Sequence, residues 1–266
     1  MKDAVLLFLE NIKLIMFSKK KPILIFTMAK VGSLSVYFSL KKWTKNQAIF
    51  HIHSLDEKEV KKGIELCFKN KIYPGSKSSV FSINKKIISK GKPYKIISLF
   101  RDPLERNISA FFDVFELYTG KKPTNFNGDF KTLKRLYHEK LTHVYPLNWF
   151  EKQFFEGTKI NVYDECFDKE KGFQIIDKNN VEVLLINSNM DNNQKEYLIA
   201  VFCNLKNFKL ENRNISSEKE YAEYYKEFKK KMRFSTAYLN QLYGSKYAQH
   251  FFTEEYIKNQ IKKWSE

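Results

Sequence analysis

Cysteine is scarce in this chain. Its 266 residues include three cysteines, Cys67, Cys166 and Cys203, which lie far apart and form no CxxC pair. That spacing argues against a disulfide framework and against a structural zinc site, and it is typical of a reducing cytoplasm. We therefore expect a cytoplasmic protein without disulfides and without a bound metal ion.

Long hydrophobic runs are also missing. The stretch 4–17 is apolar but too short to span a bilayer, and Glu10 and Lys13 interrupt it. Lysines 19–21 follow it, on the wrong side for a secretory signal. We expect instead an N-terminal helix over about residues 1–20 that docks on the protein or makes a peripheral contact with the inner face of a membrane.

Internal repeats and long linkers rich in proline, glycine or serine are absent from the sequence. With 43% hydrophobic residues the chain can bury one sizeable core, so we expect a single domain over residues 1–266. Acidic residues are few, since 30 Asp and Glu stand against 47 Lys and Arg and leave a net charge of +17. Such a charge favours nucleic acid, anionic lipid headgroups, or a phosphorylated or sulfated small molecule or glycan as partner, although a lysine-rich solvated surface explains it equally well.

Several short apolar segments have the composition of buried strands. They are rich in β-branched and aromatic residues, as is typical of parallel strands covered on both faces. The predicted strands are Lys21–Thr27, Gln47–Ile52, Tyr94–Phe100, Lys159–Tyr163 and Val181–Ile186.

Helical patterns alternate with these strands. The predicted helices are Val36–Trp43, Ser54 to about Asn70, Leu104–Tyr118 and, mixed with other structure, Phe130–Phe155. Ser54 is the expected N-cap of the second helix, and Glu57 completes a capping box. The alternation predicts an α/β fold, in which helices flank a mainly parallel sheet on both faces. The lysine-rich segment 216–266 predicts a helical C-terminal part packed on the core.

A polar turn follows the first predicted strand. It reads Lys30, Val31, Gly32, Ser33, Leu34 and Ser35, and it opens into a helix. Glycine lets backbone amides approach an anion closely, and the helix N-terminus adds partial positive charge, so the turn can hold a phosphate. Lys30 adds a full charge, and Ser33 and Ser35 add hydroxyl donors. The lysine precedes the glycine, so this is not the GxxxxGK[ST] loop of P-loop kinases.

A second polar signature follows the strand at Tyr94–Phe100. Arg101 leaves that strand, Pro103 starts a helix and Ser109 lies about two turns further along. Arginine can bind a phosphate through two hydrogen bonds, and a serine hydroxyl can complete the shell. The alternative is that Arg101 and Asp102 only cap and pair locally. Ligands of parallel sheets bind at the carboxyl ends of strands, so both signatures are expected in one cleft.

Together the two signatures resemble those of sulfotransferases that use 3′-phosphoadenosine 5′-phosphosulfate (PAPS). Residues 30–35 resemble the loop that binds the 5′-phosphosulfate, and residues 101–109 resemble the 3′-phosphate segment RDPxxRxxS. The resemblance covers about residues 23–112 and implies a P-loop-like sulfotransferase fold, with PAPS as co-substrate and adenosine 3′,5′-bisphosphate as product. It implies that Arg101 and Ser109 hold the 3′-phosphate, and that Lys30 stabilises the leaving phosphate without a metal ion. The RKGxxG segment of cytosolic sulfotransferases is missing, which leaves the adenine without an assigned partner.

Two histidines lie at the end of the second predicted strand. His51-Ile52-His53 resembles the HxH of the uronyl 2-O-sulfotransferase branch, in which a histidine is the catalytic base. Side chains at i and i+2 of a strand share one face, and a neutral histidine can accept a proton from a hydroxyl. We favour His53 as the base because it is nearer the strand end, and His51 would orient it or the substrate. A structural role for both is the alternative.

The C-terminal part carries a more diffuse similarity. Asn214–Ser216 with Lys219 and Tyr221, and then Ser245–Phe252, resemble the tail of a bacterial family of capsular polysaccharide synthesis proteins. This resemblance implies a saccharide acceptor, from the capsule or another cell-surface glycan. Lys219 could reach a phosphate of the donor, and a solvated helix lysine is the alternative.

The sequence therefore predicts a PAPS-dependent sulfotransferase acting on a saccharide hydroxyl. One alternative is a P-loop-type kinase acting on a small molecule, for which the Walker lysine is missing. Another is a module that binds an anionic glycan or nucleic acid without chemistry. No helix-turn-helix, RRM or zinc-finger spacing supports nucleic acid as a partner. An inactive sulfotransferase-like scaffold is a further alternative.

Overall fold

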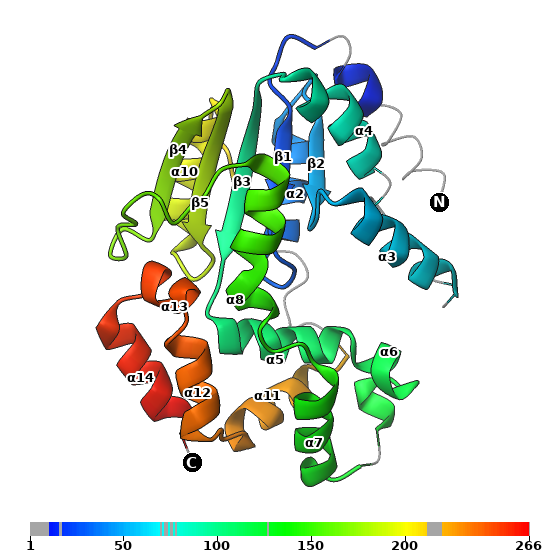
Figure 1. The fold of residues 1–266 in the computed structure, drawn as a ribbon, viewed down its shortest axis with the longest axis vertical. Helices are drawn as coiled ribbons and strands as arrows, with labels where there is room; N and C mark the ends of the chain where they lie inside the picture. Colours follow the sequence, from blue (N-terminus) through cyan, green and yellow to red (C-terminus); the bar gives the residue numbers. More distant parts are fainter. Residues whose placement is uncertain are drawn as a thin grey trace.

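The computed structural model describes residues 11–15, 18–69, 71, 74, 77, 79–126, 128–211 and 220–265. Within them, five strands form one sheet in the order β2-β1-β3-β5-β4 (Figure 1). The strands are β1 Ile23–Phe26, β2 Ile49–Ile52, β3 Tyr94–Phe100, β4 Phe173–Lys178 and β5 Val181–Asn187. β1 pairs in parallel with β2 and β3, β3 pairs in parallel with β5, and β4 runs antiparallel to β5. The mainly parallel sheet is confirmed.

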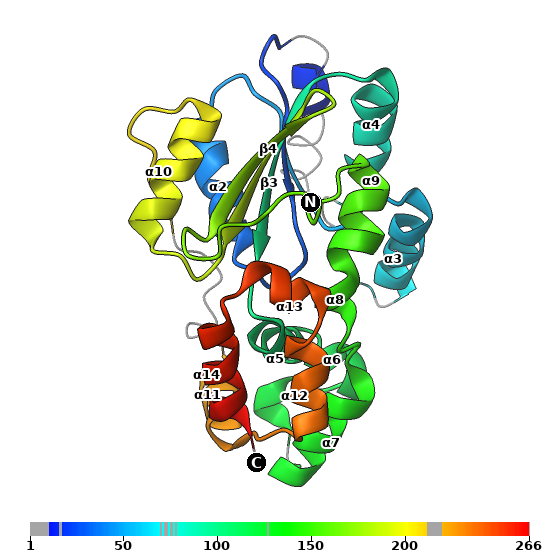
Figure 2. The ribbon, with the colours of Figure 1, turned by 60° about the vertical axis from the view of Figure 1, so that its left-hand side comes forward.

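Helices cover both faces of this sheet, as predicted (Figure 2). One face carries α2 (Ser33–Trp43) and α10 (Asn192–Cys203). The other carries α3 (Glu57–Lys69), α4 (Ser79–Lys86) and the helical stretch α8 (Tyr145–Trp149) to α9 (Glu156–Thr158), with the π-helix Phe150–Phe155 between them. All four residues of β1 are fully buried, which explains their unbroken apolar sequence.

The predicted strand at Lys159–Tyr163 is wrong. Lys159 adopts a left-handed backbone with φ 59° and ends α9, and the residues after it form a turn. Ile160 and Val162 are buried, so their apolar character reflects packing and not pairing. The strand that was missed is β4, which joins β5 through Asn179 and Asn180. Both asparagines have positive φ, 56° and 64°, as a type I′ hairpin turn requires.

Two helix boundaries also differ from the prediction. The helix expected at Leu104–Tyr118 is divided into α5 (Pro103–Asp113) and α6 (Phe115–Thr119). Ser54 does not cap α3, because Asp56 Oδ1 accepts the hydrogen bonds from Lys58 N (2.8 Å) and Glu59 N (3.3 Å). The Ser54 hydroxyl instead accepts from Asp56 N at 3.1 Å.

The C-terminal part is helical, as predicted, over the described residues 220–265. Its helices are α11 (Ala222–Lys231), α12 (Thr236–Tyr243), α13 (Lys246–Phe251) and α14 (Glu254–Trp264). They lie below the carboxyl ends of the strands, near α5 and α7 (Phe130–Lys140) (Figure 1). The Phe251 ring of α13 stacks on Phe100 at the end of β3, with centroids 4.3 Å apart, and so joins these helices to the sheet.

Of the helix expected over residues 1–20, residues 11–15 are helical, 18–20 are not, and the rest lies outside the described residues. Asn11 docks this helix on the edge strand β2, since its amide donates to Ile49 O (3.0 Å) and accepts from Ile49 N (3.3 Å). Among the described residues, no helix combines the length and the apolar character needed to cross a bilayer.

Candidate functional site

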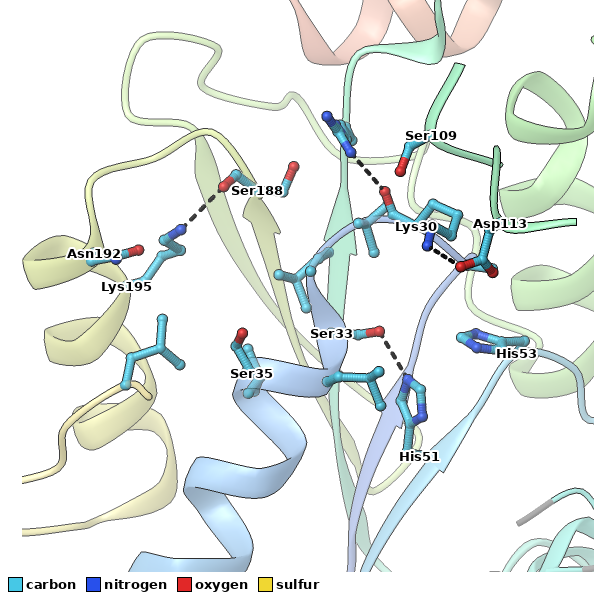
Figure 3. Close-up of a pocket in the computed structure, with 18 of the residues that line it drawn as sticks. Lys30, Ser33, Ser35, His51, His53, Ser109, Asp113, Ser188, Asn192 and Lys195 are labelled. Carbon is cyan, nitrogen blue, oxygen red and sulfur yellow. Dashed lines mark hydrogen bonds and ion pairs between the residues drawn. The ribbon is translucent and has the colours of Figure 1, made fainter. Parts of the chain in front are cut away.

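A pocket of about 530 Å³ lies where β1, β2, β3 and β5 end (Figure 3). Every predicted site residue that the structure describes lines it, namely Lys30, Val31, Gly32, Ser33, Leu34, Ser35, His51, His53, Arg101 and Ser109. Lys219 lies outside the described residues. The fold therefore brings both polar signatures and both histidines to one cavity, whose volume is that of a ligand site (~300–1,000 Å³).

The Lys30 turn has an unusual backbone. Lys30 and Gly32 both have left-handed φ angles, 73° and 82°. A Cβ at Gly32 would meet no atom within 4 Å, so the glycine is needed for its backbone angle and not for space. A left-handed lysine costs about 1–2 kcal/mol, and such strain persists only where surrounding contacts hold it.

Two arginines of the second signature hold this turn. Arg101 Nη1 donates to Lys30 O at 3.1 Å, and Arg106 Nε donates to Ala29 O at 3.1 Å. Arg106 is 6% exposed and lies against the Tyr145 ring, 4.6 Å from its centroid. The two signatures, more than sixty residues apart in sequence, are thus directly bonded to each other.

The Lys30 ammonium lies 2.7 Å from Asp113 Oδ1. Asp113 is four residues beyond Ser109 on α5, and both side chains line the pocket. The lysine side chain is 12% exposed, whereas that of Asp113 is 41% exposed. No predicted motif included Asp113, although its i+4 spacing from Ser109 places both on one helix face.

His51 is a neutral ring at the pocket wall. Its Nε2 lies 2.8 Å from the Ser33 hydroxyl, and its ring centroid is 4.7 Å from that of His53. Burial, assisted by the neighbouring His53, lowers the pKa of His51 to about 3. His51 therefore stays uncharged at neutral pH and fixes the hydroxyl of the turn.

The protonation of His53 follows from its hydrogen bond. Its Nδ1 lies 2.6 Å from Thr27 O, and because a carbonyl only accepts, Nδ1 carries the proton. Burial lowers the pKa of His53 below its ordinary value. The hydrogen bond to Thr27 O raises the pKa but does not offset the burial, and nearby positive charges lower the pKa further. The neutral ring thus keeps a lone pair on Nε2, as a general base requires.

The backbone around His53 is held rigidly. The Thr27 hydroxyl donates to Leu99 O (2.7 Å) and accepts from Leu99 N (3.2 Å), which ties the end of β1 to β3. Trp149 Nε1 donates to His53 O at 3.1 Å. Thr27 therefore holds the His53 ring, and Trp149 of α8 holds its backbone.

Asp102 connects the second signature with the C-terminal helices. Its Oδ1 accepts from Glu105 N (2.8 Å) and caps α5, as the local alternative predicted. Its Oδ2 accepts from the hydroxyls of Tyr243 (2.9 Å) and Tyr256 (3.4 Å) of the C-terminal helices. Burial raises the pKa of Asp102, although the hydrogen bonds from Glu105 N and Tyr243 oppose this.

Arg101 combines local pairing with a place in the pocket. Its Nη2 lies 3.7 Å from Glu105 Oε2, one turn along α5. The Tyr247 hydroxyl donates to Arg101 O at 2.6 Å and accepts from Arg101 N at 3.1 Å. A single tyrosine of α13 thus clamps the peptide groups of Arg101 at the strand end.

Further cations gather around Glu105, beside the Arg101 end of the pocket. Its carboxylate contacts Lys229 Nζ at 2.5 Å and Lys263 Nζ at 3.2 Å. Burial alone would raise the pKa of Glu105, but the bond and charge of Lys229 and the other cations hold it below its ordinary value. Lys229 and Tyr225 of α11 both line the pocket. The sequence did not single them out, because its one signal for them is a spacing of four residues on a lysine-rich helix, which many exposed residues share.

A second pocket of about 400 Å³ adjoins the first. It shares His51 and His53 with the first pocket. Its other walls include Ile52, Ser54, Glu59, Val60, Gly63, Val80 and Tyr145. The histidine pair therefore lines both cavities, so that a base there can be reached from both.

Within the described ranges, no group of three or more His, Cys, Asp and Glu side chains is arranged to hold a metal ion.

Comparison with known proteins connects part of the chain with a family model. Residues 123–253, just under half of the chain, match a family model described as "Putative capsular polysaccharide synthesis protein". The match links this part of the chain with capsular polysaccharide synthesis. The matched segment contains Tyr225 and Lys229 of the pocket but neither the Lys30 turn nor the Arg101 segment. No curated protein and no solved structure matches the chain.

Proposed function

We propose that the chain is a sulfotransferase that moves the sulfuryl group of PAPS to a hydroxyl of a saccharide, in a capsular or other cell-surface glycan. The observation that carries this proposal is the shared pocket. The Lys30 turn and the Arg101–Ser109 segment line it from two strand ends and are joined by the Arg101–Lys30 hydrogen bond. The family match at residues 123–253 supports a glycan as the acceptor.

The pocket has two cationic poles, which suits a donor with two anionic ends. Arg101 and Ser109, with Tyr225 and Lys229 beside them, form the pole for the 3′-phosphate. The Lys30 turn and the N-terminus of α2 form the pole for the 5′-phosphosulfate. Adenosine monophosphate would use only one of these poles, so the arrangement selects for a nucleoside bisphosphate.

The chemistry uses His53 and Lys30. PAPS supplies an activated sulfuryl group when bound. His53 Nε2 takes the proton of the acceptor hydroxyl as its oxygen bonds to sulfur, while the bond from sulfur to the 5′-phosphate oxygen breaks. The Lys30 ammonium and the amides of its turn stabilise the charge that develops on the departing phosphate. His51 keeps the Ser33 hydroxyl oriented toward this end of the pocket.

Lys30 has to leave Asp113 to act in this way. Their ion pair is only partly buried, and the Asp113 carboxylate is 41% exposed. When the donor binds, its phosphate oxygens replace the Asp113 carboxylate as the partner of the Lys30 ammonium. Asp113 thus keeps the ammonium at the pocket wall until the donor binds.

The acceptor approaches from the second pocket. The first pocket holds the donor in this proposal, and the second pocket is lined by the same His53. Its walls combine the Glu59 carboxylate, which accepts hydrogen bonds from sugar hydroxyls, with the Tyr145 ring and apolar side chains that can contact a sugar face. Donor and acceptor therefore both reach His53, where the acceptor oxygen can lie next to Nε2 and face the sulfur.

Ligand selectivity in thermal unfolding tests the proposal. Adenosine 3′,5′-bisphosphate at a hundred times its Kd should stabilise the chain by about 2.7 kcal/mol, which raises Tm by about 5–10 °C. Adenosine 5′-monophosphate and ATP with magnesium should give much smaller shifts. Arg101→Ala should abolish the selectivity, whereas Arg135→Ala, which removes an exposed arginine paired with Glu139, should keep it. A larger shift with ATP would favour the kinase, and equal shifts for all three nucleotides would favour a binding module.

A further inference from the structure

One wall of the first pocket has no role in the transfer described above. Ser188 follows β5, Asn192 and Lys195 belong to α10, and Leu210 lies in the segment after that helix. Figure 3 shows Ser188, Asn192 and Lys195 together on the side of the pocket away from the histidines. No motif in the sequence marks these residues.

The order of the strands indicates what this wall faces. Across the sheet the order is β2, β1, β3, β5, and these strands carry in turn the histidines, the Lys30 turn, Arg101 and Ser188 at their carboxyl ends. Neighbouring strands lie ~4.8 Å apart, so the row spans about 14 Å, the length scale of one extended nucleotide. With the sulfuryl group at the histidines, the 5′-phosphate at Lys30 and the 3′-phosphate at Arg101, the nucleobase is left for the β5 end.

The side chains of this wall suit an uncharged planar ring. Lys195, the cation of this wall, donates to the backbone oxygen of Ser188 at 3.1 Å, and burial lowers the pKa of its ammonium. Asn192 lines the pocket with an amide group, a type of group that can both donate and accept hydrogen bonds, and Leu210 offers an apolar surface. The Ser188 Oγ is buried without a hydrogen-bond partner among the described residues, and such an atom is usually satisfied by a ligand or water.

The wall is also fixed in place. Leu210 N donates to Glu196 Oε1 of α10 at 2.9 Å, and Glu211 N donates to the Ser39 hydroxyl of α2 at 2.8 Å. The loop is therefore held between the two helices that cover this face of the sheet. A base entering here would meet an ordered surface and would lose little binding free energy to ordering the loop.

We propose that Ser188, Asn192 and Leu210 form the nucleobase subsite of the pocket, and that Asn192 recognises the 6-amino group of adenine. This inference rests on the proposed function, because it takes the two phosphate positions from it. An asparagine amide pairs with adenine through two hydrogen bonds, accepting from the 6-amino group and donating to a ring nitrogen. Purines that lack the amine lose one of these bonds.

Calorimetry with two ligands and three proteins tests this subsite. The ligands are adenosine 3′,5′-bisphosphate and purine riboside 3′,5′-bisphosphate, which differ only in the 6-amino group. The proteins are the wild type, Asn192→Ala, and Asn193→Ala as a matched control on the next, exposed residue of α10. Asn192 is exposed at the start of its helix, so its truncation leaves the core intact.

The wild type and the control should bind the adenosine ligand about 5- to 30-fold more tightly than the purine ligand, the effect of one hydrogen bond of about 1–2 kcal/mol. In Asn192→Ala the ratio of the two affinities should fall to less than about twofold. The side chain that distinguishes the two ligands is then missing, so the 6-amino group no longer adds affinity. A wild type that binds both ligands equally, or an Asn192→Ala protein that keeps the preference, overturns the subsite while leaving the donor site standing. A wild type that binds neither bisphosphate overturns the proposed donor and the subsite with it.

Discussion

Residues 23–113 and residues 123–253 contribute different kinds of side chain to the pocket. The first region supplies the Lys30 turn, the histidines and the Arg101–Ser109 segment, in an order that the sequence reveals. The second, which matches the capsular polysaccharide family model, supplies the wall at Ser188 and the α11 residues without any readable motif. Motifs thus locate the Lys30 turn and the Arg101 segment, whereas other pocket residues, including the charged Lys229 and Asp113, are brought there by the fold.

Side chains of the second region also hold the first in place. Tyr247 clamps the peptide groups of Arg101, Tyr243 binds the carboxylate of Asp102, and Lys229 pairs with Glu105. The segment that resembles a phosphate-binding motif is therefore positioned by tyrosines and a lysine more than a hundred residues further along. We therefore expect that substitutions of pocket side chains in the first region lower the rate or the affinity for ligand. Substitutions that remove a contact between the two regions should lower the free energy of unfolding.

The largest effect should come from the charge of the first region. Lys30→Ala should lower the release of adenosine 3′,5′-bisphosphate from PAPS, measured with a panel of neutral and acidic oligosaccharides as acceptors, by about 10²–10³-fold. The reason is that the leaving phosphate loses a preorganised cation. Lys258→Ala, which removes an exposed lysine of α14, is the control and should have little effect. An unchanged rate in Lys30→Ala would remove the lysine from the mechanism.

A loss of stability should follow from breaking the contact between the regions. Asp102→Ala removes the cap of α5 and leaves the buried Tyr243 hydroxyl unpaired, so the free energy of unfolding should fall by about 2–4 kcal/mol in urea titrations. Asp129→Ala removes another aspartate N-cap, that of α7, which accepts from Thr132 N and contacts no buried tyrosine hydroxyl among the described residues. Its loss should be clearly smaller. Equal losses for the two variants would mean that Asp102 does no more than cap its helix.

The smallest effect should be a change in how stability depends on pH. His51 has a pKa of about 3 in the folded chain and about 6.5 when unfolded, so the unfolded state binds the extra proton below pH 6.5. The stability contributed by the neutral ring is complete above pH 6.5 and is lost as the pH falls from 6.5 toward 3, by up to about 1.4 kcal/mol per pH unit.

His51→Gln, which cannot titrate, should flatten this decline when unfolding free energies are measured between pH 7 and pH 5. If the slope of His51→Gln equals that of the wild type, His51 is not the neutral buried ring described here.

Much of the first region could be predicted because its signals are local. Strand β3 occupies the predicted Tyr94–Phe100, and the turns after β1 and β3 carry their glycine, proline and cations in sequence order. The segment around Ile160 and Val162, by contrast, has the apolar composition of a strand but forms a turn. Both side chains are buried, and an apolar composition indicates burial without showing that the backbone pairs with another strand. The hairpin at Asn179–Asn180 was missed although both asparagines tolerate the positive φ of its turn.

The missing parts of the site depend on contacts between distant residues. Asp113 and Lys229 lie on helices whose faces the sequence cannot orient toward a particular sheet edge. The tautomer of His53 depends on Thr27 O, which the strand order alone brings within reach. Local patterns could therefore propose which residues bind phosphate, but not which ones hold them or complete the pocket.

A crystal structure of the chain with adenosine 3′,5′-bisphosphate tests the central claim most directly. We expect the 3′-phosphate on Arg101 and Ser109, the 5′-phosphate against the amides of residues 30–35, and Lys30 moved from Asp113 to that phosphate. A bisphosphate held by only one of the two turns, or bound elsewhere on the surface, would contradict the account.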